Sequence, residues 1–193
     1  MTEVVDEPTD EELISAVARG DRRSFDDLMS RHQDLVFSVC VRIMGSRDAA
    51  LDATQETLVT VFRKASQFRG DSAFTTWLYR VATNTCYDEL RKAKRRRAEP
   101  LPEHHDPVDV RVGEQIESVE LAPTIESALG ELSAEFRAAL VLSDIQGMSM
   151  SEIAEALELP VGTVKSRVFR ARRILAEILG NQLDRPRRPS TEP

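Results

Sequence analysis

The chain has 193 residues and a formal net charge of −7, with 26 Lys and Arg against 33 Asp and Glu. Hydrophobic residues make up 41% and aromatic residues only 5%, a balance that allows a buried core and favours helices over sheets. No apolar run approaches the roughly 18 residues of a membrane span, and the acidic N-terminus has no apolar signal segment, so we expect neither a transmembrane helix nor a secretory signal.

The negative charge is concentrated in two segments. Residues 1–12 contain six acidic residues and no basic residue, and residues 98–127 contain eight acidic residues and one basic residue. The remainder of the chain therefore carries a net charge of +6. We expect the free protein to bind random DNA weakly, while its folded parts keep enough positive charge for a specific nucleic-acid contact.

Helical periodicity runs through the first half of the chain after a tail at residues 1–10, which we expect to be disordered. Apolar residues recur at intervals of three and four and predict helices near residues 13–17, 25–43, 51–65 and 74–97. The last of these segments ends with six basic residues among seven at positions 91–97.

Cap and breaker residues separate these predicted helices. Gly45 is expected to end the second helix, Ser46 to begin the third, and Ser72 to cap the fourth. The series of the third segment consists of Leu51, Thr54, Leu58, Phe62 and Ala65, which are therefore predicted to share its inner face.

Residues 98–123 interrupt the helical pattern with four prolines, many acids and no aromatic residue, and predict a flexible acidic linker. Residues 124–183 then predict a second bundle of about four helices, with Ser133 as the cap of the second of them, and residues 184–193 a loose tail. The expected fold class is all-α, with two small helical domains at residues 11–97 and 124–183.

The second domain contains a short helix, a tight turn and a basic second helix, which together predict a helix-turn-helix. Ser149 and Glu152 form a capping box at the start of the short helix. Pro160 and Gly162 then break the pattern, and five of the next eleven residues, 163–173, are basic. Such a helix fits the DNA major groove, where Arg and Lys reach base edges and phosphates.

The segment 68–84 of the first domain places aromatic rings close to polar and basic side chains. The rings are Phe68, Phe74, Trp77 and Tyr79, and the polar neighbours include Arg69, Arg80, Asn84 and Arg91. Bases stack on rings and phosphates attract cations, so this combination suits single-stranded nucleic acid. Helical spacing favours a core position for Phe74 and Trp77, whereas the loop position of Phe68 favours a functional role.

The remaining reactive side chains give no sign of catalysis. Cys40 and Cys86 occupy apolar helical positions and are expected to be buried, reduced thiols of a cytoplasmic protein. His32 is expected to be packed, and His104 and His105 lie in the linker, where solvated histidines are favoured over a metal site. No phosphate-binding Gly-rich loop, catalytic triad or metal-ligand cluster occurs in the sequence, so we expect no catalytic residue, no metal and no cofactor.

Three ordered motifs, at residues 52–56, 68–84 and 160–172, carry a family resemblance. The chain resembles the sigma factors of bacterial RNA polymerase, in the small extracytoplasmic-function (ECF) group, over about residues 11–180. The resemblance implies that the first domain binds core polymerase and reads the −10 promoter element as a melted strand. It implies that the second domain reads the −35 element as duplex, and that the protein is not an enzyme.

The resemblance also implies a role for individual residues. Those assigned to the helix that docks on a coiled coil of the β′ subunit are Asp52, Gln55 and Glu56, although Leu51 stands where family members often have an acid. Those assigned to the −10 strand are Phe68, Arg69, Asp71, Ser72, Arg80, Asn84, Asp88 and Arg91. Those assigned to the −35 groove are Lys165, Ser166, Phe169 and Arg170, while Arg167, Arg172 and Arg173 are either phosphate contacts or surface charge.

The implied partners are the β and β′ subunits of core polymerase, promoter DNA both duplex and melted, and an anti-sigma protein. Direct membrane insertion is not expected. Three alternatives stay open: a dimeric LuxR-type regulator that needs no polymerase, an enzyme, and a relative that binds polymerase without initiating. The segment 68–84 argues against the regulator, because a reader of duplex DNA needs no single-strand aromatics there.

The length of the linker is consistent with two separate DNA contacts. Elements about two duplex turns apart are separated by roughly 70 Å. The 26 residues of the linker reach roughly 85 Å when extended, and prolines favour extension.

Overall fold

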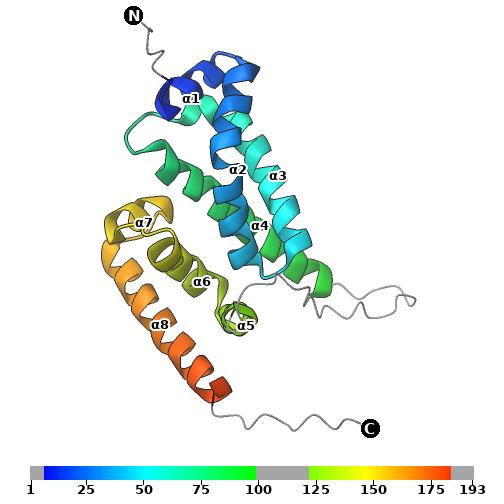
Figure 1. Ribbon diagram of the computed structural model, residues 1–193, viewed down its shortest axis with the longest axis vertical. Coiled ribbons are helices and arrows are strands. Elements are labelled where there is room, and N and C mark those ends of the chain that lie inside the picture. The colour runs from blue at the N-terminus through cyan, green and yellow to red at the C-terminus, as the bar shows by residue number, and fades with distance from the viewer. Residues whose placement is uncertain (1–6, 99–121, 184–193) are drawn as a thin grey trace, which may run out of the picture.

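The computed structural model describes residues 7–98 and 122–183, and every regular element in these ranges is a helix, as the fold prediction requires (Figure 1). The first range contains α1 (Asp10–Ala18), α2 (Arg22–Met44), α3 (Arg47–Lys64), the short 3-10 helix η1 (Ala65–Gln67) and α4 (Phe74–Ala98). The second contains α5 (Ala122–Glu131), α6 (Ala134–Leu140), the π-helical turn η2 (Val141–Ile145), α7 (Met150–Ala156) and α8 (Val161–Leu183). Most of the predicted linker, its two histidines, residues 1–6 and the C-terminal tail fall outside these ranges. The predicted disorder of residues 1–10 was wrong at its end, because Thr9 caps α1 and Asp10 begins it. The linker prediction was wrong at its edges, because Ala98 ends α4 and residues 122–123 begin α5.

Helices α2, α3 and α4 pack side by side into the first bundle, and α1 crosses its end (Figure 1). Fully buried apolar side chains such as Val36, Val61 and Leu78 form the centre of this bundle. His32 is packed as predicted, because its Nε2 lies 2.6 Å from Asp10 Oδ2 and its ring stands against Phe74. This contact fixes α1 against α2.

The prediction for the buried face of α3 was wrong at two positions. Leu51 and Phe62 are 44% and 40% exposed, whereas Thr54 is buried as predicted, together with Thr57 and Val61. The hydroxyls of both threonines donate to backbone carbonyls four residues earlier, at 2.7 Å. Because their polar groups are satisfied within the helix, threonines can replace larger apolar side chains in this tight packing.

The expected cap of α4 was also wrong, since the helix begins at Phe74 and not directly after Ser72. The backbone N–H of Phe74 donates to the Glu11 carboxylate at 3.3 Å. A carboxylate at the positive end of a helix stabilises it. Helix α1 therefore supplies to α4 the acceptor that the local sequence lacks.

The second bundle begins with the caps that the sequence predicts. Ser133 accepts the N–H of Phe136, and Ser149 and Glu152 make both hydrogen bonds of the capping box. Gly162 differs from the prediction, because it lies inside the first turn of α8 and only Pro160 precedes the helix. The glycine does not break the helix, since the first turn needs no special backbone conformation.

The two bundles share one hydrophobic core rather than standing apart. Leu142, Ile153 and Val164 of the second bundle belong to the same cluster of buried side chains as Leu28 and Val36 of the first. Helices α6 and η2 contact α2, and α7 contacts α4 (Figure 1). The domains are therefore closed on each other.

Two polar groups hold this closed arrangement. The buried Arg137 guanidinium donates to the backbone carbonyl of Ile43 at 2.8 Å, across the domain boundary, and also to Gly130 and Leu132. Burial lowers the pKa of Arg137. The Gln146 side chain accepts from Tyr79 at 2.9 Å and donates to Ser38 at 3.1 Å, so it joins α4 and α2 to the second bundle.

Cys40 and Cys86 are free and fully buried, as predicted, and the hydrogen bond with the Cys40 thiol, together with burial, raises the pKa of Cys86. Within the described residues, none of the helices combines the length and apolarity that a membrane crossing requires. The same part of the chain contains no cluster of three or more acidic, His or Cys side chains suited to a metal ion.

Candidate nucleic-acid interface

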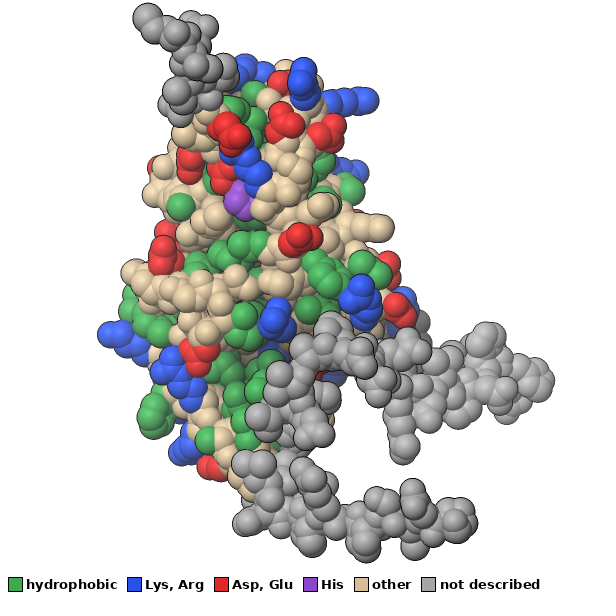
Figure 2. Space-filling model, in the orientation of Figure 1, with side chains coloured by type: hydrophobic (Ala, Val, Ile, Leu, Met, Phe, Trp, Pro, Cys, Tyr) green, Lys and Arg blue, Asp and Glu red, His purple; other side chains and the backbone are tan. Residues whose placement is uncertain are grey.

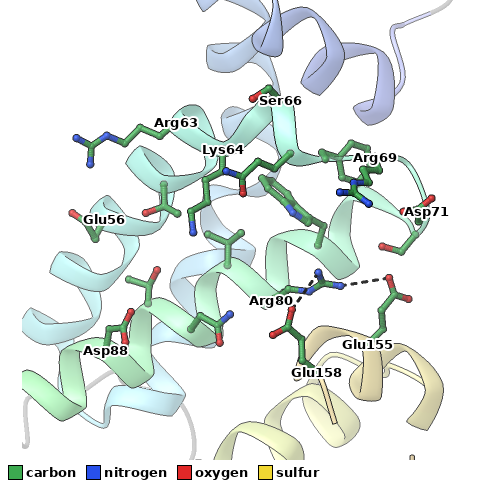
Figure 3. Close-up of a pocket in the computed structure, with 18 of the residues that line it drawn as sticks. Glu56, Arg63, Lys64, Ser66, Arg69, Asp71, Arg80, Asp88, Glu155 and Glu158 are labelled. Carbon is green, nitrogen blue, oxygen red and sulfur yellow. Dashed lines mark ion pairs between the residues drawn. The ribbon is translucent and has the colours of Figure 1, made fainter. Parts of the chain in front are cut away.

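A pocket of about 810 Å³ opens between the end of α3, the loop before α4 and one face of α4 (Figure 3). Seven of the eight residues predicted to meet the −10 strand line it: Phe68, Arg69, Asp71, Ser72, Arg80, Asn84 and Asp88. The loop between η1 and α4 and the helix face therefore bring together residues up to 20 positions apart in the sequence.

The loop side of the pocket combines a partly buried ring with exposed polar groups. Phe68 is half-buried. Its ring packs edge-to-face with those of Phe74 and Trp77, at centroid distances of 6.0 and 5.7 Å. Arg69 and Asp71 are exposed on either side of Gly70, whose φ of +75° suits glycine. The ring is anchored by the core while it still lines the pocket.

The helix side of the pocket is a row of polar residues along α4. Arg80, Asn84 and Asp88 follow one another at intervals of four, so they lie on one face of the helix. Arg91 does not line the pocket and instead donates to Asp88 at 2.8 Å. A strand that follows this row would meet alternating charge and hydrogen-bonding groups.

Tyr79 does not belong with the other rings. It is 6% exposed and faces the second bundle, where it donates to Gln146, and burial raises its pKa to about 12. Phe74 and Trp77 are buried as their helical spacing predicts. Phe68 is thus the ring of segment 68–84 that is partly open to solvent and lines the pocket with its neighbouring loop.

The pocket also contains residues that the sequence analysis missed. Thr60, Arg63 and Lys64 line it from the last turns of α3, and Lys92 lines it from α4. The pair of basic residues at the end of α3 was the available signal, although cations are common at helix C-termini and do not by themselves indicate a binding site. Figure 3 shows Lys64 reaching into the pocket and Arg63 pointing away from it.

Two acidic residues of the second domain complete the pocket wall. Glu155 of α7 and Glu158 of the following turn lie 3.7 and 3.6 Å from the Arg80 guanidinium (Figure 3). Nothing in the local sequence predicts this contact, since Arg80 and Glu155 are 75 residues apart.

The predicted recognition helix is α8, and its reading face is open to solvent. Lys165, Ser166, Phe169 and Arg170 are all exposed, Phe169 to 68%. The opposite face buries Val164 and Val168. Figure 2 shows Lys and Arg side chains projecting along α8 beside exposed hydrophobic ones.

The other arginines of α8 are engaged within the protein. Arg172 makes two hydrogen bonds to Asp144 at 2.6 and 3.0 Å, and Arg173 lies 3.7 Å from Glu177. Arg167 is half-buried near Glu135. Hydrogen bonds to the Glu135 carboxyl lower its pKa most, and the charge of Arg167 lowers this pKa further. These contacts favour surface charge over base contact for Arg172 and Arg173.

The face assigned to polymerase lies on α3. Asp52, Gln55 and Glu56 are exposed there, and the exposed Leu51, Val59 and Phe62 follow the same helix. Exposed apolar side chains mixed with acids along one helix are typical of a protein-binding surface. Val59 was not among the predicted residues, and Leu51 and Phe62 were predicted to face the core.

Comparison with known proteins finds two matching regions of the chain. Residues 28–96 match Sigma-70 region 2, and residues 124–175 match Sigma-70, region 4. The RNA polymerase sigma-H factor of Pseudomonas aeruginosa is 36% identical over 180 residues, which cover 88% of this chain and 93% of that protein. The ECF RNA polymerase sigma factor SigM of Mycobacterium tuberculosis is 38% identical over 174 residues, which cover 90% of this chain and 86% of SigM.

A solved structure shows the same architecture. The sigma factor RpoE in complex with the anti-sigma factor NepR, from Bartonella quintana, matches with a TM-score of 0.66 and 28% identity. The match covers 84% of this chain and 99% of RpoE.

The chain therefore belongs to the ECF sigma factors of bacterial RNA polymerase. Proteins of this family recognise promoters and initiate transcription together with the polymerase, which confirms the function expected from the sequence.

Proposed function

We propose that the pocket of the first domain receives the melted non-template strand of the −10 element. The observation that carries this assignment is the convergence of Phe68, Arg80 and Asn84 on one pocket, from a loop and a helix. A ring, a cation and an amide side by side provide stacking, phosphate attraction and base-edge hydrogen bonds for an unpaired nucleotide.

The energetics of such a pocket make opening depend on the promoter sequence. Extruding a base from the duplex costs a few kcal/mol, and stacking on a protein ring returns about 1–3 kcal/mol per base. Because these terms nearly cancel, hydrogen bonds to the correct bases decide whether the strands stay open.

The second domain reads the −35 element as duplex through the exposed face of α8. Lys165 and Arg170 provide the side chains that reach base edges and phosphates in the major groove, and Ser166 and Phe169 lie between them on the same face. Arg167 and Arg173 act at most on phosphates. Because this face is exposed in the closed protein, it needs no rearrangement to meet DNA.

The exposed face of α3 docks on the β′ coiled coil of core polymerase. Asp52 and Glu56 suit a basic partner, and Leu51, Val59 and Phe62 provide the apolar contact that a stable protein interface requires. The protein acts in the cytoplasm, where the polymerase is, adds no catalytic chemistry of its own, and is held inactive by an anti-sigma protein. Support for this last partner comes from RpoE, which was solved bound to the anti-sigma factor NepR.

Reconstitution with bacterial core polymerase tests this function. Run-off transcription from a library of randomised promoters should yield defined start sites, with selected sequences near −35 and −10. Unselected transcripts, or no transcription above core polymerase alone, would contradict the proposal. Duplex binding by the free chain as a dimer, independent of polymerase, would instead support a LuxR-type regulator.

Replacing the ring of Phe68 tests the pocket. Phe68→Ala should leave binding of a −35 duplex unchanged but reduce opening of the −10 region, measured by permanganate reactivity of unpaired thymines. Circular dichroism must show an intact fold, because the ring also contacts Phe74 and Trp77. Normal opening by a folded Phe68→Ala protein would remove the ring from the mechanism.

A further inference from the structure

In the closed arrangement of the domains, the two proposed DNA-binding faces differ in their accessibility. The reading face of α8 is exposed, whereas the −10 pocket is walled by Glu155 and Glu158 of the second domain. Both carboxylates approach the Arg80 guanidinium, within 3.7 Å (Figure 3). The cation best placed to meet a DNA phosphate in the pocket is already occupied by two acids of the same chain.

The glutamates also reverse the charge of the pocket. The residues that line it from the first domain comprise five basic and four acidic side chains, a balance of +1. Glu155 and Glu158 bring the acidic count to six, so the closed pocket has a balance of −1. A strand of DNA phosphates would be attracted to the pocket without the second domain and repelled from it in the closed protein.

The surrounding packing makes closure the resting state. Buried side chains of both domains form one core, and Tyr79, the residue before Arg80, donates a hydrogen bond across the boundary to Gln146. An interface that is large and hydrophobic does not open freely. The turn that carries Glu158 is tightly set, since this residue has a φ of +54°, a conformation that glycine favours over glutamate.

We propose that Glu155 and Glu158 imitate DNA phosphates at Arg80, so that the free chain keeps its own −10 pocket shut. This inference rests on the proposed function of the pocket. Reading two promoter elements roughly 70 Å apart requires the domains to separate. Binding to polymerase would therefore uncover Arg80 in the same step that spreads the domains, and the free factor would not capture single-stranded DNA.

The test compares two double variants of the full chain that change charge equally. Glu155→Gln with Glu158→Gln removes the carboxylates at Arg80. Glu126→Gln with Glu131→Gln is the control, because these exposed residues of α5 make no ion pair within the described part of the chain. The probe is fluorescein-labelled single-stranded DNA of ten random nucleotides, and fluorescence anisotropy without polymerase reports binding.

The first variant should bind the probe about three- to ten-fold more tightly than the wild-type chain, the gain that two partly exposed ion pairs can supply. The control should match the wild type. Adding Arg80→Ala to the first variant should remove the gain. Equal affinity of the variant and its control, or a gain that survives Arg80→Ala, would overturn the proposal.

Domain separation provides a second readout that needs no DNA. Donor and acceptor dyes on Gln33→Cys and Ala176→Cys report the distance between the domains by energy transfer, and the buried Cys40 and Cys86 stay unlabelled. Transfer should be equal in the wild-type chain and both variants, because the shared core keeps the domains together, and should fall when core polymerase is added. Transfer that stays high with polymerase bound would overturn the proposal. Failure of the proposed function is distinct, since it appears as absent promoter selection by the wild-type chain with core polymerase.

Discussion

Two arginines of α8, two positions apart, show how neighbouring contacts decide the role of a side chain. Arg172 is neutralised by two hydrogen bonds to Asp144. Arg170 is exposed, and within the described ranges no carboxylate lies at ion-pair distance from it. A guanidinium without a partner can form a bidentate contact with guanine at no cost in lost protein contacts.

Arg170→Ala should therefore cost about 1–3 kcal/mol of −35 binding and relax selectivity at one base pair. Selection from a randomised −35 duplex measures both effects. The matched control is Arg172→Ala, which should leave base preference unchanged because that side chain is held by Asp144. If Arg170→Ala weakens all sequences equally, Arg170 contacts a phosphate and not a base.

The difference between Arg170 and Arg172 shows which properties of single residues could be predicted from the sequence. Exposure of Lys165, Ser166 and Arg170 follows from helical spacing against Val164 and Val168, which is a local property. The neutralisation of Arg172 depends on a residue 28 positions away, and that of Arg80 on residues of another domain. Spacing along the chain carries no information on such partners, so the list of candidate residues was broader than the set left open to DNA.

At the scale of helices, the sequence predicted most elements and fewer of their faces. The capping residues Ser133 and Ser149 act locally and were identified with their hydrogen bonds. The face of α3 was misassigned in part: Thr54 packs inward as predicted and Thr57 beside it, whereas Leu51 and Phe62 are exposed. A pattern of large apolar residues describes a core face only when the helix is not approached closely by its neighbours.

The ion pair of Asp144 with Arg172 joins η2 to α8 and gives this contact a dependence on pH. The hydrogen bond from Arg172, and secondarily that from Ser143, lowers the pKa of Asp144 below its usual value of 3.8, although partial burial opposes the shift. Because the folded pKa lies below the unfolded one, the stabilisation is fully present above the unfolded pKa. It is lost as the pH falls through the folded pKa.

Asp144→Asn should lower stability at pH 7 by up to about 1 kcal/mol, a modest loss because both side chains are partly exposed to solvent. The difference in melting temperature from the wild type should shrink below about pH 4 and also in high salt. Thermal unfolding at pH 7 and pH 3 measures it, with the exposed Asp26→Asn as control. A difference that stays constant across this range would exclude the ion pair as its source.

At the scale of the whole molecule, a closed protein must serve a promoter whose two elements are far apart. Arg137 and Gln146 fix the domains against each other through hydrogen bonds across the boundary. These bonds have to break when the two DNA faces are spread over roughly 70 Å. After separation, the segment 98–123 is the covalent link that limits their distance.

Shortening this segment should separate folding from function. Deleting residues 104–115 leaves 14 of the 26 positions, which reach roughly 46 Å and cannot span two elements about two duplex turns apart. Since a linker that cannot span two sites abolishes their joint binding, run-off transcription should fall by about 100-fold or more. Helical content by circular dichroism should not change.

The control replaces the same twelve residues by glycine and serine, which keeps the length and removes the same charges. This chain should retain transcription within a few-fold of the wild type, because flexible segments of equal length reach comparable distances. Equal loss in both chains would assign the effect to the acidic residues themselves. Equal activity in both would mean that the domains never occupy the two elements together, and the mechanism of separated contacts would be abandoned.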